Sequence, residues 1–347
     1  FGTAVNDVLR LVDGDNGFFL VCHDDVALAP NVVRLLVAEL FRSNAGMVGP
    51  KLTEWDHPKM LQHVGLGLDR FGEVDPIVDP GEADQEQHDA VRDVFVLPSA
   101  CVLVRADLFR TLGGFDPAIS FHGEDVDLCW RAHLTGARVI VAPDAAVRHI
   151  ERLPDRRPDL SHRTLRSRHR MRAVATLTGG SRLLGRSIQL VLLTIVELVV
   201  GLFTGRFGEA LSSARALVGL IPRTGSIVAR RRAIRGQRVV PEREILGLQD
   251  RGSSRLTSYL RGQDSETFVG TDSTVRRWRE ASFGPLLAWV CVVLAVIIGS
   301  RDFIRTGVPA VGEFLRFPES PGDLWAHYRE SFDPRGFGAT VALPTGY

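Results

Sequence analysis

The chain has 347 residues, of which 45% are apolar, and its formal net charge is +1. This length and apolar content exceed what one core usually organises, so they predict at least two regions and exclude wholesale disorder. Residues 1–150 hold 12 basic and 23 acidic side chains, whereas residues 151–347 hold 30 basic and 18 acidic ones. This division of charge excludes a uniformly basic nucleic-acid binder.

The cysteines indicate neither a disulfide-linked fold nor a zinc-binding module. They are widely scattered, at positions Cys22, Cys101, Cys129 and Cys291. Their spacing matches neither a disulfide framework nor a paired metal motif. We therefore expect the acidic part of the chain to lie in a reducing compartment.

The first predicted elements are a strand, an acidic turn, a helix and a second strand. Residues 17–22 form an apolar run typical of a strand buried on both faces, and the run ends in His23, Asp24 and Asp25. Apolar residues then recur at helical spacing over 32–41, before a strand at 47–52. This order indicates an α/β fold, in which ligands bind at the carboxyl ends of strands, where the two aspartates fall.

Short elements separated by turn residues are expected over residues 63–141. The most distinctive is a helix from Glu124 to Thr135, whose acidic first turn is favoured by the helix dipole. The others are a hairpin of strands 63–68 and 74–78, strands 94–97, 100–104 and 138–141, and a helix at 106–112.

Simpler explanations exist for both acidic clusters. The cluster at residues 23–25 is also compatible with a turn followed by a helix cap. The cluster at the start of the 124–135 helix is a common helix-start feature, and Asp127 and Arg131 stand at i,i+4, where they can pair. The residue pattern alone does not decide between these structural explanations and a functional site.

Four motifs follow one another in order along the first half of the chain. They are His23-Asp24-Asp25-Val26, Gly113-Gly114-Phe115-Asp116, Gly123 to Arg131, and Pro143 to His149. Together they resemble the family 2 glycosyltransferases of the GT-A fold, including rhamnosyl- and galactofuranosyl-transferase-like members. More narrowly, the chain resembles an actinobacterial type fused to a C-terminal multi-span membrane region.

The resemblance implies a fold class: an α/β, GT-A-like, incomplete Rossmann-type domain followed by membrane helices. Members of the family begin with nucleotide-binding strands that this sequence lacks, so we expect a fragment truncated at both ends and inactive by itself. The implied metal ligands for Mg²⁺ or Mn²⁺ are Asp25, Asp24 and His149. A divalent ion there neutralises the charge that develops on a departing nucleoside diphosphate.

The resemblance also assigns the catalytic and substrate-binding side chains. Asp125 matches the general base that takes the proton from an acceptor hydroxyl, and neighbouring carboxylates are expected to raise its pKa. Trp130 is a candidate for stacking on a sugar ring, with a core indole as the alternative. The substrate-binding candidates are Glu124, Asp127, Trp130, Arg131 and His122.

Two apolar segments and their arginine-rich flanks predict a membrane association. Residues 281–300 carry no charge, and as a helix they measure roughly 30 Å, enough to cross a bilayer core. Because basic flanks stay cytoplasmic, residues 187–222 are expected to form a membrane hairpin or interfacial helices. The predicted regions are a partial glycosyltransferase domain at 1–150, a basic juxtamembrane segment at 151–186, the 187–222 hairpin, a basic cytoplasmic linker at 223–280, a transmembrane helix at 281–300 and an extracytoplasmic segment at 301–347.

These observations combine into one functional prediction and one alternative. The chain is predicted to transfer a sugar, with inversion, from a nucleotide-sugar donor to a lipid-linked (polyprenyl) or cell-wall glycan acceptor at the cytoplasmic membrane face. Expected partners are the donor, the acceptor and membrane lipids, with no nucleic acid, and the full-length protein is expected to be a multi-pass cell-membrane protein. The alternative is a catalytically inactive sugar-nucleotide-binding or scaffold domain.

Overall fold

The computed structural model describes residues 1–204, 207–250, 293–298 and 300. The chain divides into two compact units, Phe1–Ala281 and Ser282–Tyr347. In the second unit residues 293–298 are helical. The remainder of the predicted 281–300 membrane helix, the 251–280 part of the predicted linker and the 301–347 segment lie outside the described residues.

A mixed β-sheet forms the centre of the first unit. In the described part of the chain seven strands build it, in the order β1-β8-β3-β9-β2, with β4 added to β3 and β7 added to β9. The pair β3 and β9 is parallel, whereas the other pairs are antiparallel. The strands are β1 Phe18–Cys22, β2 Val26–Leu28, β3 Met47–Glu54, β4 Leu61–His63, β7 Arg92–Asp93, β8 Cys101–Arg105 and β9 Val139–His149.

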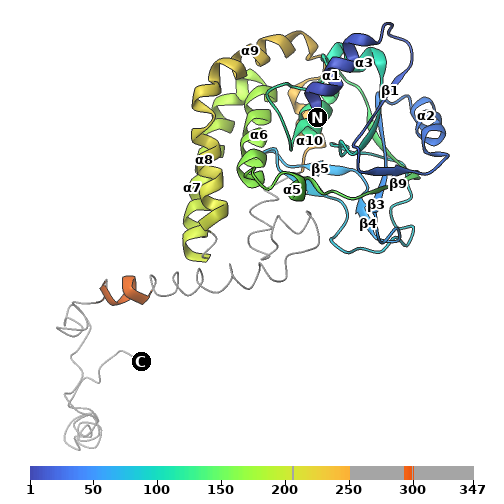
Figure 1. The fold of residues 1–347 in the computed structure, drawn as a ribbon. Helices are drawn as coiled ribbons and strands as arrows, with labels where there is room; N and C mark the ends of the chain where they lie inside the picture. The colour runs from blue at the N-terminus through green and yellow to red at the C-terminus, as the bar shows by residue number, and fades with distance from the viewer. Residues whose placement is uncertain (205–206, 251–292, 299, 301–347) are drawn as a thin grey trace, which may run out of the picture. The chain divides into compact units, whose positions relative to one another are not determined.

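Helices cover both faces of this sheet because its strands alternate apolar side chains between two cores. Val48 and Ile140 pack with α2 (Val32–Arg42) in one core. Met47 and Val139, each one residue earlier, pack in the other core with α3 (Ala106–Leu112), α4 (Glu124–Leu134) and α6 (His162–Leu177). Figure 1 shows α2 and α6 on opposite sides of the strands. The molecule is therefore an α/β layered fold.

The remaining elements surround this layered core. In Figure 1, α7, α8 and α9 stand beside α6, and α1 lies next to α3. A hairpin of β5 and β6 pairs Leu66 with Pro76. The bounds are α1 Gly2–Leu11, β5 Leu66–Leu68, β6 Val74–Pro76, α5 Leu153–Arg156, α7 Gly180–Thr204, α8 Phe207–Val218, α9 Thr224–Ile234 and α10 Glu242–Leu248, with 3₁₀ turns at Ile221–Arg223 and Arg235–Gln237.

Most predicted elements of the first 150 residues are confirmed. The predicted helices at 32–41, 106–112 and 124–135 correspond to α2, α3 and α4. The strand predicted at 94–97 is wrong: within the described residues its β-pairing is an isolated bridge between Val96 and Leu66, although residues 94–97 are buried. The strand predicted at 138–141 instead continues to His149, because its second half pairs with β2 and β3.

One helix in the described part of the chain, over Gly180–Gly201, is long and apolar enough to cross a bilayer, and only 17% of its most apolar window is buried. This finding rests on the length and the composition of that helix. The neighbouring α8 has 12 residues and is roughly 18 Å long, too short to cross. Along α7 several apolar side chains are about half exposed: Ile188, Leu192, Ile195 and Val199.

Candidate metal centre and catalytic carboxylates

Three side chains from distant parts of the sequence form a potential metal site. One ligand atom from each of His23, Asp25 and His149 lies within 4.8 Å of the others. His149 Nε2 is 3.4 Å from Asp25 Oδ1, and His23 Nδ1 is 3.8 Å from the same oxygen. The structure thus brings together Asp25 and His149, two of the three ligands that the resemblance implied, and places His23 beside them.

The strand register explains this convergence. Val26 pairs with His149 in the antiparallel β2–β9 pair, and the Ile150 amide donates to the Asp25 carbonyl over 3.1 Å. Asp25, just before β2, is therefore held beside the end of β9. His23 follows β1, whose Cys22 pairs with the first residue of β8, and it enters the group from that side.

The donor set fits a divalent cation. Asp25 Oδ1 is buried, and it has no hydrogen-bond partner among the residues that the structure describes. A buried carboxylate oxygen without a donor is costly unless a cation balances it. One carboxylate and two imidazoles are ligand types that first-row divalent metals accept.

Burial also keeps the two imidazoles in the form that binds metals. Desolvation lowers the pKa of His149 to about 4 and shifts the pKa of His23 downward, although the Asp25 charge opposes both shifts. At neutral pH both rings are therefore uncharged. A neutral imidazole has one nitrogen lone pair to offer to a cation.

Ser99 connects this group to the acidic start of α4. The Ser99 hydroxyl donates to Glu124 Oε1 over 3.2 Å, and its oxygen lies 3.2 Å from His23 Nε2. Since the hydroxyl proton is used toward Glu124, the oxygen accepts from His23 Nε2–H. The Nδ1 lone pair of His23 then faces Asp25.

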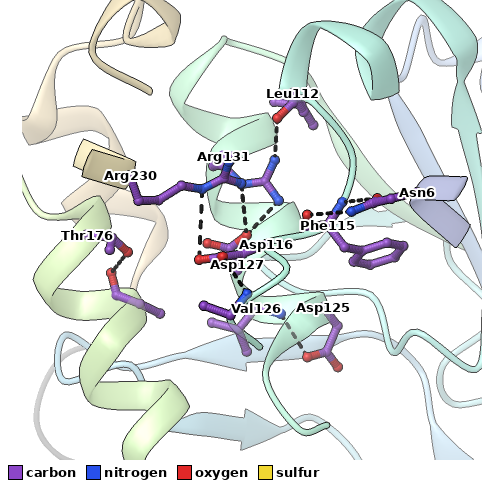
Figure 2. Close-up of polar contacts among 12 residues, drawn as sticks. Asn6, Leu112, Phe115, Asp116, Asp125, Val126, Asp127, Arg131, Thr176 and Arg230 are labelled. Carbon is purple, nitrogen blue, oxygen red and sulfur yellow. Dashed lines mark hydrogen bonds and ion pairs between the residues drawn. The ribbon is translucent and has the colours of Figure 1, made fainter. Parts of the chain in front are cut away.

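Asp125, the predicted base, is the next residue of α4. One of its carboxylate oxygens accepts from the Val126 amide over 2.8 Å, as Figure 2 shows. Burial raises its pKa, and burial together with the charge of Asp125 raises the pKa of Glu124 to about 7. A carboxylate with a raised pKa is a better proton acceptor at neutral pH than an ordinary one.

Asp24 lies apart from the group formed by His23, Asp25 and His149. Its carboxylate is 81% exposed and accepts from Arg156 Nη1 over 2.8 Å and 2.9 Å. The hydrogen bond from Arg156 lowers the pKa of Asp24. Of the two neighbouring aspartates, only Asp25 faces the imidazoles.

Asp127 and Arg131 form an ion pair inside the protein. Arg131 is 0% exposed, and it donates to Asp127 from Nε and Nη2. Figure 2 shows the Asp125 carboxylate pointing away from this cluster. Of the two alternatives for Arg131, substrate binding and pairing with Asp127, the structure therefore shows the pairing.

Trp130 and His122 have different surroundings. Trp130 is 3% exposed and packs edge-on against Phe95, so the core position is the one observed. His122 lies two residues before the start of α4 and has a positive φ of 60°, and its Nε2 lies 2.8 Å from His162 Nδ1. Burial lowers the pKa of His122 to about 3.

His23 and Ser99 were not assigned a role from the sequence. His23 occupies the first position of the acidic motif, where its ring replaces a carboxylate, so the motif itself held a signal for it. Ser99 carried no such signal. Its role depends on the pairing of β1 with β8, which places residues 23 and 100 opposite each other.

Comparisons with known proteins agree with these motifs. A family model described as "Glycosyltransferase like family 2" matches residues 1–174. A "Pre-mycofactocin glycosyltransferase" of Mycobacterium tuberculosis H37Rv is 46% identical over 59 residues, covering 17% of this chain and 12% of that protein. The "O-antigen biosynthesis protein RfbC" of Myxococcus xanthus is 30% identical over 140 residues, covering 37% of this chain and 10% of that protein. The chain thus spans about a tenth of the length of these relatives.

Solved structures give low-scoring likenesses. GalNAc-T7 with UDP, GalNAc and Mn²⁺ has 14% identity and a TM-score of 0.38, covering 52% of this chain and 35% of that chain. Residues 1–349 of S. aureus TarS have 15% identity and a TM-score of 0.31, covering 76% of this chain and 72% of that chain.

Proposed function

The chain belongs to the glycosyltransferase-like family 2, whose model matches residues 1–174, and from this premise we propose that it contributes to a metal-dependent, inverting sugar transfer. The donor is a nucleotide sugar, and the acceptor is a lipid-linked or cell-wall glycan at the cytoplasmic face of the membrane. The observation that carries the proposal is the chain of contacts that runs from the group of His23, Asp25 and His149 through Ser99 to Glu124, the residue before Asp125 on α4.

The cation site is proposed to receive the donor diphosphate. His23, Asp25 and His149 would hold Mn²⁺ or Mg²⁺, and the two imidazoles favour Mn²⁺, because Mg²⁺ prefers an all-oxygen shell. When bound, the ion neutralises negative charge on the leaving diphosphate. The neutral state of both rings supports this role, since a protonated ring repels a cation.

Asp125 is proposed to act as the general base. The acceptor hydroxyl oxygen attacks the anomeric carbon as the bond from that carbon to the diphosphate oxygen breaks. The hydroxyl proton passes to the Asp125 carboxylate, and the nucleoside diphosphate leaves with the bonding electron pair. One displacement of this kind inverts the configuration at the anomeric carbon.

The helices that follow residue 178 are proposed to bring this chemistry to a membrane. Ile188, Leu192, Ile195 and Val199 recur at helical spacing on α7, and each is 48–55% exposed. Arg182 and Arg186 lie just before them, where they can meet anionic headgroups. Because α8 is too short to cross, we favour interfacial helices over a hairpin that spans twice.

The alternative function is an inactive domain that binds sugar nucleotides. The intact set of Asp25, Asp125 and His149 argues against it, because a scaffold needs neither a base nor a cation. Metal titration of the protein separates the two possibilities, since a scaffold has no requirement for Mn²⁺.

The decisive experiment replaces Asp125 in the full-length protein. A panel of UDP-, dTDP- and GDP-sugars first identifies the donor, and Asp125→Asn is then compared with Asp107→Asn. Asp107 is a matched control because it stands in the first turn of α3 and accepts from the next amide over 2.8 Å, as Asp125 does in α4. We expect D125N to lose at least about 100-fold in turnover while it still binds donor, and D107N to keep its activity. Unchanged turnover in D125N removes Asp125 as the base.

A further inference from the structure

Gln62, on β4, touches the candidate metal site from its outer side. Its Oε1 lies 2.9 Å from His149 Nδ1, and its Nε2 donates to Glu151 Oε2 over 2.9 Å. β4 pairs with β3, and β3 pairs with β9, so the sheet register places Gln62 beside the end of β9. No motif in the sequence singles out this glutamine.

The two hydrogen bonds of Gln62 fix which nitrogen of His149 carries the proton. A carboxylate oxygen only accepts, so the amide nitrogen of Gln62 must face Glu151 and its oxygen must face His149. That oxygen also only accepts, so His149 Nδ1 carries the hydrogen. In the neutral ring, the lone pair then lies on Nε2, the atom 3.4 Å from Asp25 Oδ1.

This arrangement leaves two acceptors facing each other. The Nε2 lone pair and Asp25 Oδ1 have no proton to share, and Asp25 Oδ1 lacks a hydrogen-bond donor within the described part of the chain. A cation between them satisfies both. Imidazoles that bind metals usually donate their second N–H to such an outer partner, which sets their orientation.

The backbone supports the same conclusion. Glu151 follows His149 by two residues and has a positive φ of 57°, which is uncommon for a residue with a side chain. Such a conformation costs free energy and persists where surrounding contacts hold it. The bond from Gln62 is a contact of this kind.

We propose that Gln62 is a positioning residue that holds His149 with its Nε2 lone pair directed at the bound divalent cation. This inference rests on the proposed metal-dependent function. Ser99 stands toward His23 as Gln62 stands toward His149, since each side chain accepts from one ring nitrogen and donates to a glutamate. The structure thus holds both rings by the same chemistry.

The test measures Mn²⁺ binding to the full-length protein, by calorimetry and by the electron paramagnetic resonance of free Mn²⁺, without donor or acceptor. It is carried out at pH 8, because metal ligands must be deprotonated to bind. Gln62→Met keeps the volume of the side chain and removes both hydrogen bonds. We expect it to weaken Mn²⁺ binding by about 10- to 100-fold.

A second pair of variants separates positioning from a general structural effect. In the His149→Ala background, adding Gln62→Met should weaken binding no further, because the glutamine acts through the missing ring. The exchange Gln62→Glu with Glu151→Gln keeps an acceptor toward Nδ1 and should restore affinity to within a few-fold of wild type. Gln87→Met, on the exposed loop where Gln87 also donates to a glutamate, is the matched control and should bind Mn²⁺ normally.

The outcomes distinguish this inference from the function on which it rests. If the wild type binds Mn²⁺ and Gln62→Met binds it equally well, Gln62 has no positioning role, while the metal site stands. If Gln62→Met weakens Mn²⁺ binding equally in the wild type and in the His149→Ala background, Gln62 again has no positioning role toward His149. If the wild type binds no Mn²⁺, both proposals fail. If binding responds as expected but no donor is turned over, the positioning role stands and the transferase proposal fails.

Discussion

Arg131 and Asp127 form a doubly hydrogen-bonded ion pair in the interior of the protein. Arg131 donates to Asp127 Oδ2 from Nε over 2.9 Å and from Nη2 over 2.6 Å, and the two side chains are 0% and 1% exposed. Arg172 of α6 pairs with Asp116 over 2.9 Å. Arg230 of α9 lies 3.9 Å from Asp116 and 3.9 Å from Asp127, and Figure 2 shows these three residues together. The cluster therefore joins α4 to helices that follow residue 150.

Breaking this pair should destabilise the protein strongly. Arg131→Met leaves Asp127 as a buried charge that has lost its closest partner, so we expect the free energy of unfolding to fall by about 3–5 kcal/mol, measured by urea denaturation. Arg157→Met is the control, because the Arg157–Asp159 pair is exposed to solvent and its loss should change the free energy of unfolding far less. Equal effects of the two substitutions would contradict the assignment of Arg131 to the core.

The metal centre predicts a sharp difference between two adjacent aspartates. Asp25→Asn removes the carboxylate that faces both imidazoles, so Mn²⁺ affinity should fall by at least about tenfold, by analogy with the loss caused by outer-shell changes. Asp24→Asn should change it by less than about threefold, since that side chain is exposed and paired with Arg156. Calorimetry on the two variants measures the difference, and a larger loss in D24N would assign the ion to the other aspartate.

His63, whose ring nitrogen Nδ1 is buried, should make the free energy of unfolding depend on pH. Desolvation lowers the pKa of His63 to about 4, from an ordinary value of 6.5, and its Nδ1 has no hydrogen-bond partner among the described residues. Between pH 6.5 and pH 4 the unfolded chain binds a proton that the folded chain excludes, so this group lowers the free energy of unfolding as the pH falls.

His63→Leu tests this dependence. Urea denaturation at pH 7 and pH 5, with chelator present to exclude metal, should show a smaller loss of stability on acidification in H63L than in the wild type. His57→Leu is the control, because the His57 side chain is 73% exposed. The same acid sensitivity in H63L and the wild type would show that His63 does not contribute.

The exposed face of α7 should mediate binding to lipid vesicles. Ile188, Leu192 and Ile195 are 52%, 55% and 50% exposed. Replacing all three by lysine removes apolar groups worth roughly 1.5–3 kcal/mol each when buried, so the partition coefficient onto zwitterionic vesicles, which do not attract the added charges, should fall by at least about tenfold in a sedimentation assay. Phe41→Lys, on α2 and 69% exposed in the wild type, should leave binding unchanged. Equal binding by the triple variant would assign membrane contact to another segment.

The sequence by itself was sufficient for most of the local elements. The apolar run before His23, the helical repeat over 32–41 and the acidic start of α4 follow from periodicity and from the helix dipole, which act over a few residues. Asp25, Asp125 and His149 were selected because they stand in short motifs that resemble those of the family 2 glycosyltransferases, and their roles stay predictions. The segment 94–97 was misassigned because an apolar run marks burial, and burial does not require a full strand.

The tertiary structure decided which side chains face one another. Asp24 and Asp25 are equivalent in the sequence, and the β2–β9 register directs only the second toward His149. Gln62 reaches that ring across two strand pairings, a relationship separated by 87 residues along the chain. Strand register is set by packing over the whole sheet, so no local pattern contains it. For the same reason the sequence did not decide whether Arg131 pairs with Asp127. The structure shows that it does, because both side chains are buried together in the interior.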